Sequence, residues 1–370
     1  MHVGYAPLFQ NPGNALSDAE VYRQELRLAE MAEPLGFDSV WSVEHHFTDY
    51  TMCPDVLQFL SYMAAKTRHA RLGSMVVVLP WHDPIRVAEQ IVLLDHLSDG
   101  RLILGIGRGL ARVEYEGLRI DQNRGRQRFL EYAELVLNGL EQGYVEGGET
   151  LRQPRRDIRP YPLKSFRGRT YAAAVSPESM PIMARLGVGL LIIPQKPWDV
   201  VRQDFESYRQ VYQEANGTPS PPPLCVGFCF VDEDAGRAEA MASKYIGGYY
   251  HTAMRHYEMT AAHFGTQQGY EFYRKVNQYI GRHGQEGAAQ DFARLMPWGT
   301  PNQVLEKLAT IRDMIHMNGL ICHFSYAGMP YEEAERNMRC FVKHVLPELK
   351  AWQTAPLPDP EPLAAPATAV

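Results

Sequence analysis

Three polar side chains at the end of an apolar run give the strongest chemical signal in this sequence. Residues 37–43 read Phe-Asp-Ser-Val-Trp-Ser-Val and are followed directly by Glu44, His45 and His46. A buried parallel strand that ends in this way delivers side chains to the mouth of a (β/α)8 barrel, where active sites lie. Imidazole is readily set as acid, base or hydrogen-bond donor near neutral pH. Side chains alternate along a strand, so we expect one or two of the three to enter a pocket; the alternative is that they satisfy one another.

A glycine-rich stretch, Gly105-Ile106-Gly107-Arg108-Gly109, follows a later apolar run. Its spacing is not the G-x-G-x-x-G of dinucleotide-binding folds, because no third glycine opens a helix. Glycines let a backbone approach a ligand closely, and the guanidinium of Arg108 can hold a phosphate with two hydrogen bonds. The alternative interpretation is a flexible loop with a solvated arginine.

A second candidate for anion binding is Ser176-Pro177-Glu178-Ser179. Ser176 stands where a helix N-cap is expected, and the N-terminus of a helix offers free N–H groups to an anion. The hydroxyls of Ser176 and Ser179 would add donors, although an ordinary cap explains the pattern as well. Taken with Arg108 in the preceding βα loop, these residues predict two loops that converge on one phosphate.

Two apolar residues, Met75 and Val76, leave the third predicted strand and could form a floor under a flat aromatic ligand. Barrel core is the equal alternative. Further along, Tyr249, His256 and Tyr257 lie on a helical stretch and are expected to pack or to face solvent. The sequence contains no CxxC pair and no His-Glu-x-x-His, so no metal site is predicted.

The elements that would position these residues alternate between strands and helices, as in a parallel sheet. The eight predicted strands cover residues 2–8, 38–43, 70–79, 101–106, 170–175, 190–193, 224–231 and 319–325. The helical patterns between and after them cover residues 17–35, 55–68, 85–97, 122–141, 177 onward, 198–215 and 331–350. This number of strands closes an α/β fold of the (β/α)8, or TIM, barrel class.

Long segments interrupt the alternation. Residues 143–168 are predicted to form a surface loop, and residues 232–318 form an insertion between strands seven and eight. Within it, residues 260–292 predict either a mobile lid over the barrel mouth or an ordered helical decoration. We expect one domain over residues 1–350, followed by a disordered, Pro/Ala-rich tail over residues 351–370.

The composition excludes some classes of partner. The net charge is −6, so no overall basic field attracts nucleic acid, and no apolar stretch approaches the ~18 residues of a membrane span. The five cysteines are scattered, which indicates reduced thiols. With no signal-peptide pattern at its start, the chain is expected to be cytoplasmic.

Taken together, these motifs resemble the bacterial luciferase family of flavin-dependent monooxygenases, and most closely its α-subunit. The resemblance covers nearly all of residues 1–350. It is carried by residues 36–48, 78–89, 94–101, 105–110, 299–301 and 346–349.

This resemblance implies a luciferase-like (β/α)8 barrel and a chemistry that uses O2 and reduced FMN, supplied by a separate flavin reductase. A C4a-peroxyflavin would form and oxygenate a small organic substrate. It implicates His45 as the catalytic residue near the flavin. The resemblance also implies flavin contacts from the residues that match the family's cofactor site, namely Glu44, Met75, Val76, Arg108, Leu110, Ser176 and Ser179. It further implies a non-prolyl cis peptide at Met75–Val76 and a homodimer formed through helices two and three.

The sequence also departs from the luciferase pattern. Gly107 stands where the luciferase α-subunit has a reactive cysteine, Ala111 replaces a tyrosine, and Val175 replaces a glutamate near the phosphate. Because these changes alter the size and polarity of the pocket, neither light emission nor an aldehyde substrate follows from the resemblance. Hydroxylation, Baeyer–Villiger insertion and aldehyde oxidation all stay open.

Two other functions stay open beside the monooxygenase. One is an oxidoreductase that uses flavin or the deazaflavin F420 without inserting oxygen; such reductases typically lack a Glu-His-His run after strand two. The other is a non-catalytic flavin-binding partner subunit, which would be expected to lose either His45 or Arg108. The chain retains all of these residues, which favours the monooxygenase.

Overall fold

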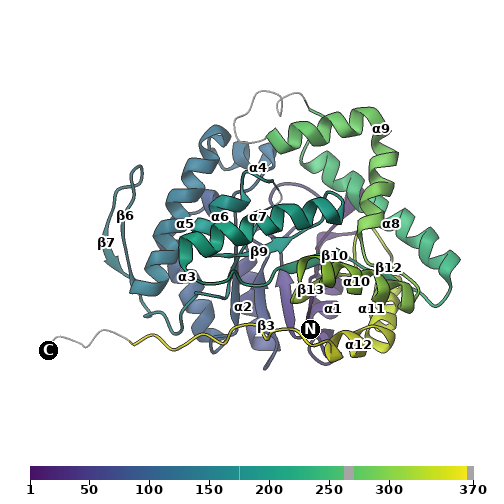
Figure 1. Cartoon of the computed structure of the whole chain (residues 1–370), viewed down its shortest axis with the longest axis horizontal. Helices are drawn as coiled ribbons and strands as arrows, with labels where there is room; N and C mark the ends of the chain where they lie inside the picture. The colour runs from purple at the N-terminus through teal and green to yellow at the C-terminus, as the bar shows by residue number, and fades with distance from the viewer. Residues whose placement is uncertain (175, 262–270, 365–370) are drawn as a thin grey trace.

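The computed structural model describes residues 1–174, 176–261 and 271–364 and contains a closed barrel of eight parallel strands (Figure 1). The order of strands is β3-β2-β1-β13-β10-β9-β8-β5, and pairing of β3 with β5 closes the ring. Their bounds are β1 His2–Tyr5, β2 Ser39–Ser42, β3 Arg71–Ser74, β5 Leu102–Gly107, β8 Thr170–Ala173, β9 Gly189–Ile192, β10 Leu224–Phe228 and β13 Gly319–His323. The predicted fold class and all eight strands are confirmed.

Amphipathic helices surround the barrel and bury their apolar faces against it. They are α1 Asp18–Met31, α2 Val56–Lys66, α3 Pro84–Leu97, α5 Gly125–Gln142, α6 Met180–Arg185, α7 Trp198–Asn216, α10 Pro301–Ile315, α11 Tyr331–His344 and α12 Leu346–Ala351. Side chains cap several of them: Ser17 accepts from the N–H of Glu20 at the start of α1, and Asp83 does the same for α3. The short helix α4, Arg112–Gly117, was not predicted.

The third predicted strand is interrupted. The ladder of β3 ends at Ser74, and the short strand β4 (Val77–Val78) resumes pairing with β5. Between them the Met75–Val76 peptide bond is cis, as the resemblance implied. The seventh predicted strand is likewise divided, because Phe230–Val231 (β11) leaves the barrel and pairs with Trp298–Gly299 (β12).

The segment predicted as a loop over residues 143–168 contains a β-hairpin instead. Its strands β6 (Tyr144–Gly147) and β7 (Gln153–Asp157) pair antiparallel outside the barrel. Most of its side chains are exposed on both faces, so the sequence shows no apolar alternation, and period-two reasoning has nothing to detect.

The insertion between β10 and β13 is largely helical. It contains α8 (Ala235–His256) and α9 (Glu271–Leu295) as well as α10. Residues 271–292 of the predicted lid region are therefore helical, with a kink at Gly284, where the backbone leaves the helical conformation. Residues 262–270 of that region lie outside the described residues. In Figure 1, α4, α8 and α9 gather at one end of the barrel and the C-terminal segment runs along the other. The insertion therefore covers the mouth of the barrel.

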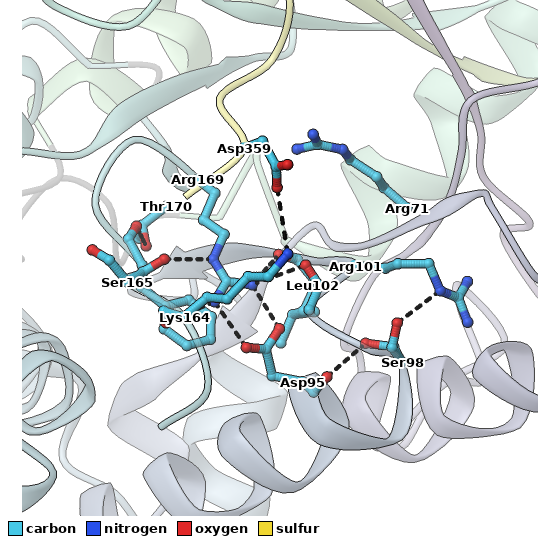
Figure 2. Close-up of polar contacts among 12 residues, drawn as sticks. Arg71, Asp95, Ser98, Arg101, Leu102, Lys164, Ser165, Arg169, Thr170 and Asp359 are labelled. Carbon is cyan, nitrogen blue, oxygen red and sulfur yellow. Dashed lines mark hydrogen bonds and ion pairs between the residues drawn. The ribbon is translucent and has the colours of Figure 1, made fainter. Parts of the chain in front are cut away.

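The opposite end is held by a buried ion pair (Figure 2). Arg169, with its side chain 1% exposed, donates from both terminal nitrogens to Asp95 at 2.6 and 2.8 Å. The tail crosses this end: Arg71 donates to the carbonyl of Pro358 at 2.8 Å, and Lys164 pairs with Asp359 at 3.4 Å. The sequence predicted disorder over residues 351–370. Residues 353–364 instead lie against the barrel, and residues 365–370 lie outside the described residues.

None of the helices in the described part of the chain combines the length and the hydrophobicity of a transmembrane helix.

Candidate active site

A cavity of about 760 Å³ opens at the carboxyl ends of the strands. It is bounded below by the ends of β2, β4, β5 and β8 and above by α8 and α9. All the predicted site residues line it, namely Glu44, His45, Met75, Val76, Arg108, Leu110, Ser176 and Ser179. A single cavity of this size is typical of a cofactor site, and it brings together residues from four βα loops.

The adjacent imidazoles of His45 and His46 contact two different buried carboxylates. His45 Nδ1 lies 2.9 Å from Glu114 Oε1, whereas His46 Nε2 lies 3.3 Å from Glu44 Oε1. Of the three residues Glu44, His45 and His46, the first two line the cavity and His46 does not, so the prediction that one or two of them enter a pocket is confirmed.

Glu44 joins the loop after β2 to the segment after the cis peptide. Its Oε2 accepts the backbone N–H of Val78 at 2.8 Å, and its Oε1 lies 2.6 Å from His82 Nε2. Burial opposes ionisation, but the hydrogen bonds from His46 and His82 outweigh it and lower the pKa of Glu44. An ionised carboxylate with these partners fixes the floor of the cavity, although one of its edges also faces the cavity.

His45 is surrounded by aromatic rings and one carboxylate. The ring of Tyr50 meets it edge-on at 4.9 Å, and the hydroxyl of Tyr257 lies 3.3 Å from His45 Nε2. Glu114 holds the other ring nitrogen, so the ring is fixed from both sides. Its side chain is 13% exposed, which leaves it reachable from the cavity.

Sequence reasoning missed three members of this cluster. Glu114 lies on α4, which was not predicted, and its side chain is fully buried. His256 and Tyr257 were expected to pack or to face solvent; instead both lie at the end of α8 beside His45. The available signal was a carboxylate six residues beyond Arg108 in the same βα loop.

The ligand atoms of His45, Glu114 and His256 lie within 4.8 Å of one another, a spacing that could hold a metal ion. The separation between His45 Nδ1 and Glu114 Oε1 is nevertheless that of an ordinary N–H···O hydrogen bond.

The loops after β5 and β8 bring to the cavity the groups suited to an anion. Arg108, Ser176 and Ser179 line the same cavity, and the two serine hydroxyls are 2.8 Å apart. The loop of Arg108 is fixed from below, because Tyr115 donates to the carbonyl of Arg108 at 2.6 Å. A second guanidinium, that of Arg126 on α5, also lines this region and was not predicted.

The floor of the cavity is apolar. Met75 and Val76 are 5% and 9% exposed and present their side chains to the cavity beside Gly107. A Cβ atom on Gly107 would overlap Val76 Cγ2. The space that a cysteine would need at position 107 is therefore occupied by the side chain of Val76.

Comparisons with known proteins agree with this architecture. Residues 1–315 match the model of the family described as luciferase-like monooxygenase. The alkanal monooxygenase alpha chain of Photorhabdus luminescens is 25% identical over 346 residues, covering 91% of this chain and 94% of that protein. The oxygenase component of flavin-dependent trigonelline monooxygenase from Acinetobacter baylyi is 30% identical over 177 residues, covering 47% and 49%.

Solved structures share the same fold. The monooxygenase RslO1 from Streptomyces bottropensis has a TM-score of 0.73 and 25% identity, with 94% of this chain and 100% of that chain covered. The oxygenating constituent of 3,6-diketocamphane monooxygenase from Pseudomonas putida, in complex with FMN, has a TM-score of 0.71 and 16% identity, covering 94% and 99%. An F420-dependent secondary alcohol dehydrogenase has a TM-score of 0.68 and 13% identity, covering 93% and 98%. By the match over residues 1–315, this chain belongs to the luciferase-like monooxygenase family.

Proposed function

We propose that this chain is the oxygenase component of a two-component monooxygenase, which takes reduced FMN from a separate reductase and uses O2 to oxygenate a small organic substrate. The observation that carries the proposal is one cavity lined together by Arg108 and two serines, by apolar Met75 and Val76, and by His45. The trigonelline relative, which is itself named as the oxygenase component of a flavin-dependent enzyme, supports the reductase partner.

The residues present fit FMN. The guanidinium of Arg108 and the hydroxyls of Ser176 and Ser179 would hold the phosphate with charge-assisted hydrogen bonds. Met75 and Val76 would support the ring, and Leu110 lies beside Arg108 in the same loop. When bound, reduced FMN supplies the electrons and activates O2, which is chemistry that no side chain provides.

The protein would contribute orientation, exclusion of water and one proton-handling group. His45 lines the cavity, Glu114 holds its Nδ1, and its Nε2 lies beside the hydroxyl of Tyr257, so this imidazole can accept or donate a proton at Nε2. The buried Glu44 keeps the loop of His45 against the segment after the cis peptide. Aromatic side chains from α8 and α9 close the upper part of the cavity and would limit the entry of water.

Those aromatic walls also limit the substrate. Tyr249, Tyr250, Phe228 and Phe292 line the cavity near His45 and favour a compact apolar or aromatic molecule. The described part of α9 lies over this region and fits either the predicted lid or a fixed cover. Hydroxylation, Baeyer–Villiger insertion and aldehyde oxidation all use such a site.

A homodimer through α2 and α3 also belongs to this proposal. Tyr62 on α2 is 39% exposed, and Leu93 and Leu97 on α3 are 50% and 58% exposed. Exposed apolar side chains gathered on adjacent helices are typical of a protein interface. Light scattering should report twice the mass of one chain, and Leu93→Glu should reduce the measured mass to that of a single chain.

The five free cysteines fit a cytoplasmic location.

The function is tested by anaerobic titration of the protein with reduced FMN, followed by O2 and a panel of aldehydes, ketones and aromatic compounds. The account expects tight binding of reduced FMN and a product that gains an oxygen atom from 18O2. Tight binding of reduced F420 with no uptake of O2 would identify the oxidoreductase alternative. Flavin binding with hydrogen peroxide as the sole product, across the panel, would favour a non-catalytic partner subunit.

A further inference from the structure

A second imidazole beside His45 has no part in the function proposed above. His256, at the end of α8, directs its Nε2 toward Glu114 Oε1 at 3.5 Å, and its Nδ1 lies 2.9 Å from Thr48 Oγ1. The same carboxylate oxygen receives His45 Nδ1 and the backbone N–H of His46, each at 2.9 Å. One oxygen atom therefore faces two imidazoles, one from the loop after β2 and one from the end of α8.

This carboxylate is ionised although it is fully buried. Burial opposes ionisation, but the charge of His45, its hydrogen bond and the nearby imidazole of His256 outweigh it and lower the pKa of Glu114 to about 2. Among the described residues, Glu114 Oε2 and His256 Nε2 are buried atoms that lack a hydrogen-bond partner. A buried negative charge with an unsatisfied oxygen favours the uptake of a proton by a neighbouring base.

The two imidazoles cannot both be charged at low cost. Their ring centroids are 5.0 Å apart, and one carboxylate balances one positive charge. Burial, with the charge of His45 as a smaller contribution, lowers the pKa of His256. The geometry therefore gives two neighbouring imidazoles a single balancing carboxylate.

We propose that Glu114 and His256 are positioning residues for His45: Glu114 keeps the proton of the neutral ring on Nδ1, and His256 competes with His45 for the single extra proton. His45 Nε2 is then an acceptor beside the hydroxyl of Tyr257, and both residues line the cavity. When His45 takes up a proton at Nε2, it becomes an imidazolium whose charge Glu114 balances. When His256 holds that proton instead, His45 takes up its own proton less readily. The placement of protons can be measured in the ligand-free protein; only its kinetic consequence rests on the proposed function.

Other titratable groups face the cluster from each neighbouring element. The rings of Tyr50 and His256 stack with their centroids 4.5 Å apart, and the hydroxyls of Tyr50 and Tyr249 are hydrogen-bonded to each other. Burial raises the pKa of Tyr249 to about 12 and raises the pKa values of Tyr50 and Tyr257 well above the usual value for tyrosine, so all three are neutral. The charged groups nearby are Asp49 in the loop after β2, the Arg112–Glu258 pair that joins α4 to the end of α8, and the Glu44–His46–His82 group.

Ring 15N NMR of the ligand-free full chain tests the proposal, with the His45 signals assigned by their loss in His45→Asn. In the wild type, neutral His45 should carry its proton on Nδ1. His256→Asn should make His45 take up its proton at a pH roughly 0.5 unit or more higher, since a competing site is lost. Glu114→Gln should move that uptake to lower pH. His251→Asn, on the exposed side of the same helix, is the matched control and should change nothing.

Three results would overturn the proposal: a neutral His45 protonated on Nε2, a change below about 0.2 pH unit in His256→Asn, or stoichiometric zinc in the purified protein. If His256→Asn does not fold, His256→Phe keeps the stacking on Tyr50 and serves instead. At saturating reduced FMN, the same variants should move the pH dependence of kcat and leave flavin affinity unchanged. If the wild type oxygenates nothing, the proposed function fails while the NMR result still decides this proposal.

Discussion

At the scale of single residues, position matters more than residue type. His45 and His46 are adjacent and chemically identical, yet only His45 lines the cavity, because its neighbour turns toward Glu44. The same principle applies to Gly107, whose missing side chain makes room for Val76. Both consequences can be tested by single substitutions.

The role of Arg108 predicts a specific loss of affinity for the phosphate of FMN. Arg108→Ala should weaken binding of reduced FMN by about 10–100-fold, since hydrogen bonds between charged groups contribute roughly 1.5–3 kcal/mol. Binding of reduced riboflavin, which has no phosphate, should be nearly unchanged. Anaerobic fluorescence titration measures both affinities. Arg112→Ala, with its guanidinium paired to Glu258 outside the cavity, is the matched control. Equal losses for FMN and riboflavin would refute the assignment.

The tight fit between Gly107 and Val76 predicts that a side chain at position 107 disturbs the floor of the cavity. Gly107→Ala should lower stability by about 1–3 kcal/mol, the usual cost of overpacking, and should weaken flavin binding. The double variant Gly107→Ala/Val76→Ala should recover most of both losses. Denaturant unfolding and flavin titration measure them. Gly247→Ala, where a Cβ meets nothing within 4 Å, is the control. Lack of recovery in the double variant would contradict the packing argument.

At the scale of elements, the sequence predicted the barrel because each strand is a short apolar run beside a helical pattern. It could not predict the hairpin β6–β7, whose polar, arginine-rich strands have no buried face to create a periodic signal. It could not find the partners of His45 either. Glu114 and His256 reach it only through packing of α4 and α8 over the barrel mouth, and local patterns carry no information about such contacts.

The contact between α1 and the end of β13 predicts a pH-dependent stability. Glu25 on α1 is fully buried and hydrogen-bonds Ser325 at 2.7 Å; burial raises its pKa from 4.5 to about 7. A raised folded-state pKa means that the folded protein retains a proton that the unfolded chain loses. Stability should therefore fall as pH rises from about 4.5 to 7, by roughly 3 kcal/mol from this group.

Glu25→Gln keeps a hydrogen-bonding side chain and removes the titration. Its stability should change less across this pH range than that of the wild type, as measured by urea unfolding at intervals of pH. Glu20→Gln, on the exposed start of the same helix, is the matched control. Identical pH dependence in Glu25→Gln and the wild type would contradict the account.

At the scale of the whole molecule, the barrel has a functional end and a structural end. The cavity, α8 and α9 occupy the carboxyl ends of the strands, while the Arg169–Asp95 pair and the C-terminal segment cover the other end (Figures 1 and 2). Leu357 of that segment is 9% exposed and packs with the residues inside the barrel. The Pro/Ala-rich composition of the tail led to a prediction of disorder, because composition alone does not show that one of its leucines, Leu357, is buried.

Leu357→Ala should therefore lower stability without altering the chemistry. The loss should be about 2–3 kcal/mol, near the lower end for a buried leucine, and flavin affinity should stay within twofold. Thermal unfolding and flavin titration report the two effects separately. Leu16→Ala, at a leucine that is 46% exposed, is the control and should be nearly neutral. A loss of flavin binding in Leu357→Ala would show that the two ends are coupled.

The most direct test of the central claim is the rate at which bound reduced FMN is reoxidised by O2. The anaerobic complex is mixed with oxygenated buffer, and flavin absorbance and release of hydrogen peroxide are followed together. If the cavity shelters the flavin beside His45, the rise of oxidised-flavin absorbance and the release of hydrogen peroxide should lag together behind the loss of reduced flavin in the wild type. This lag should shrink in His45→Asn. Reoxidation and peroxide release that match those of free reduced FMN would contradict the account.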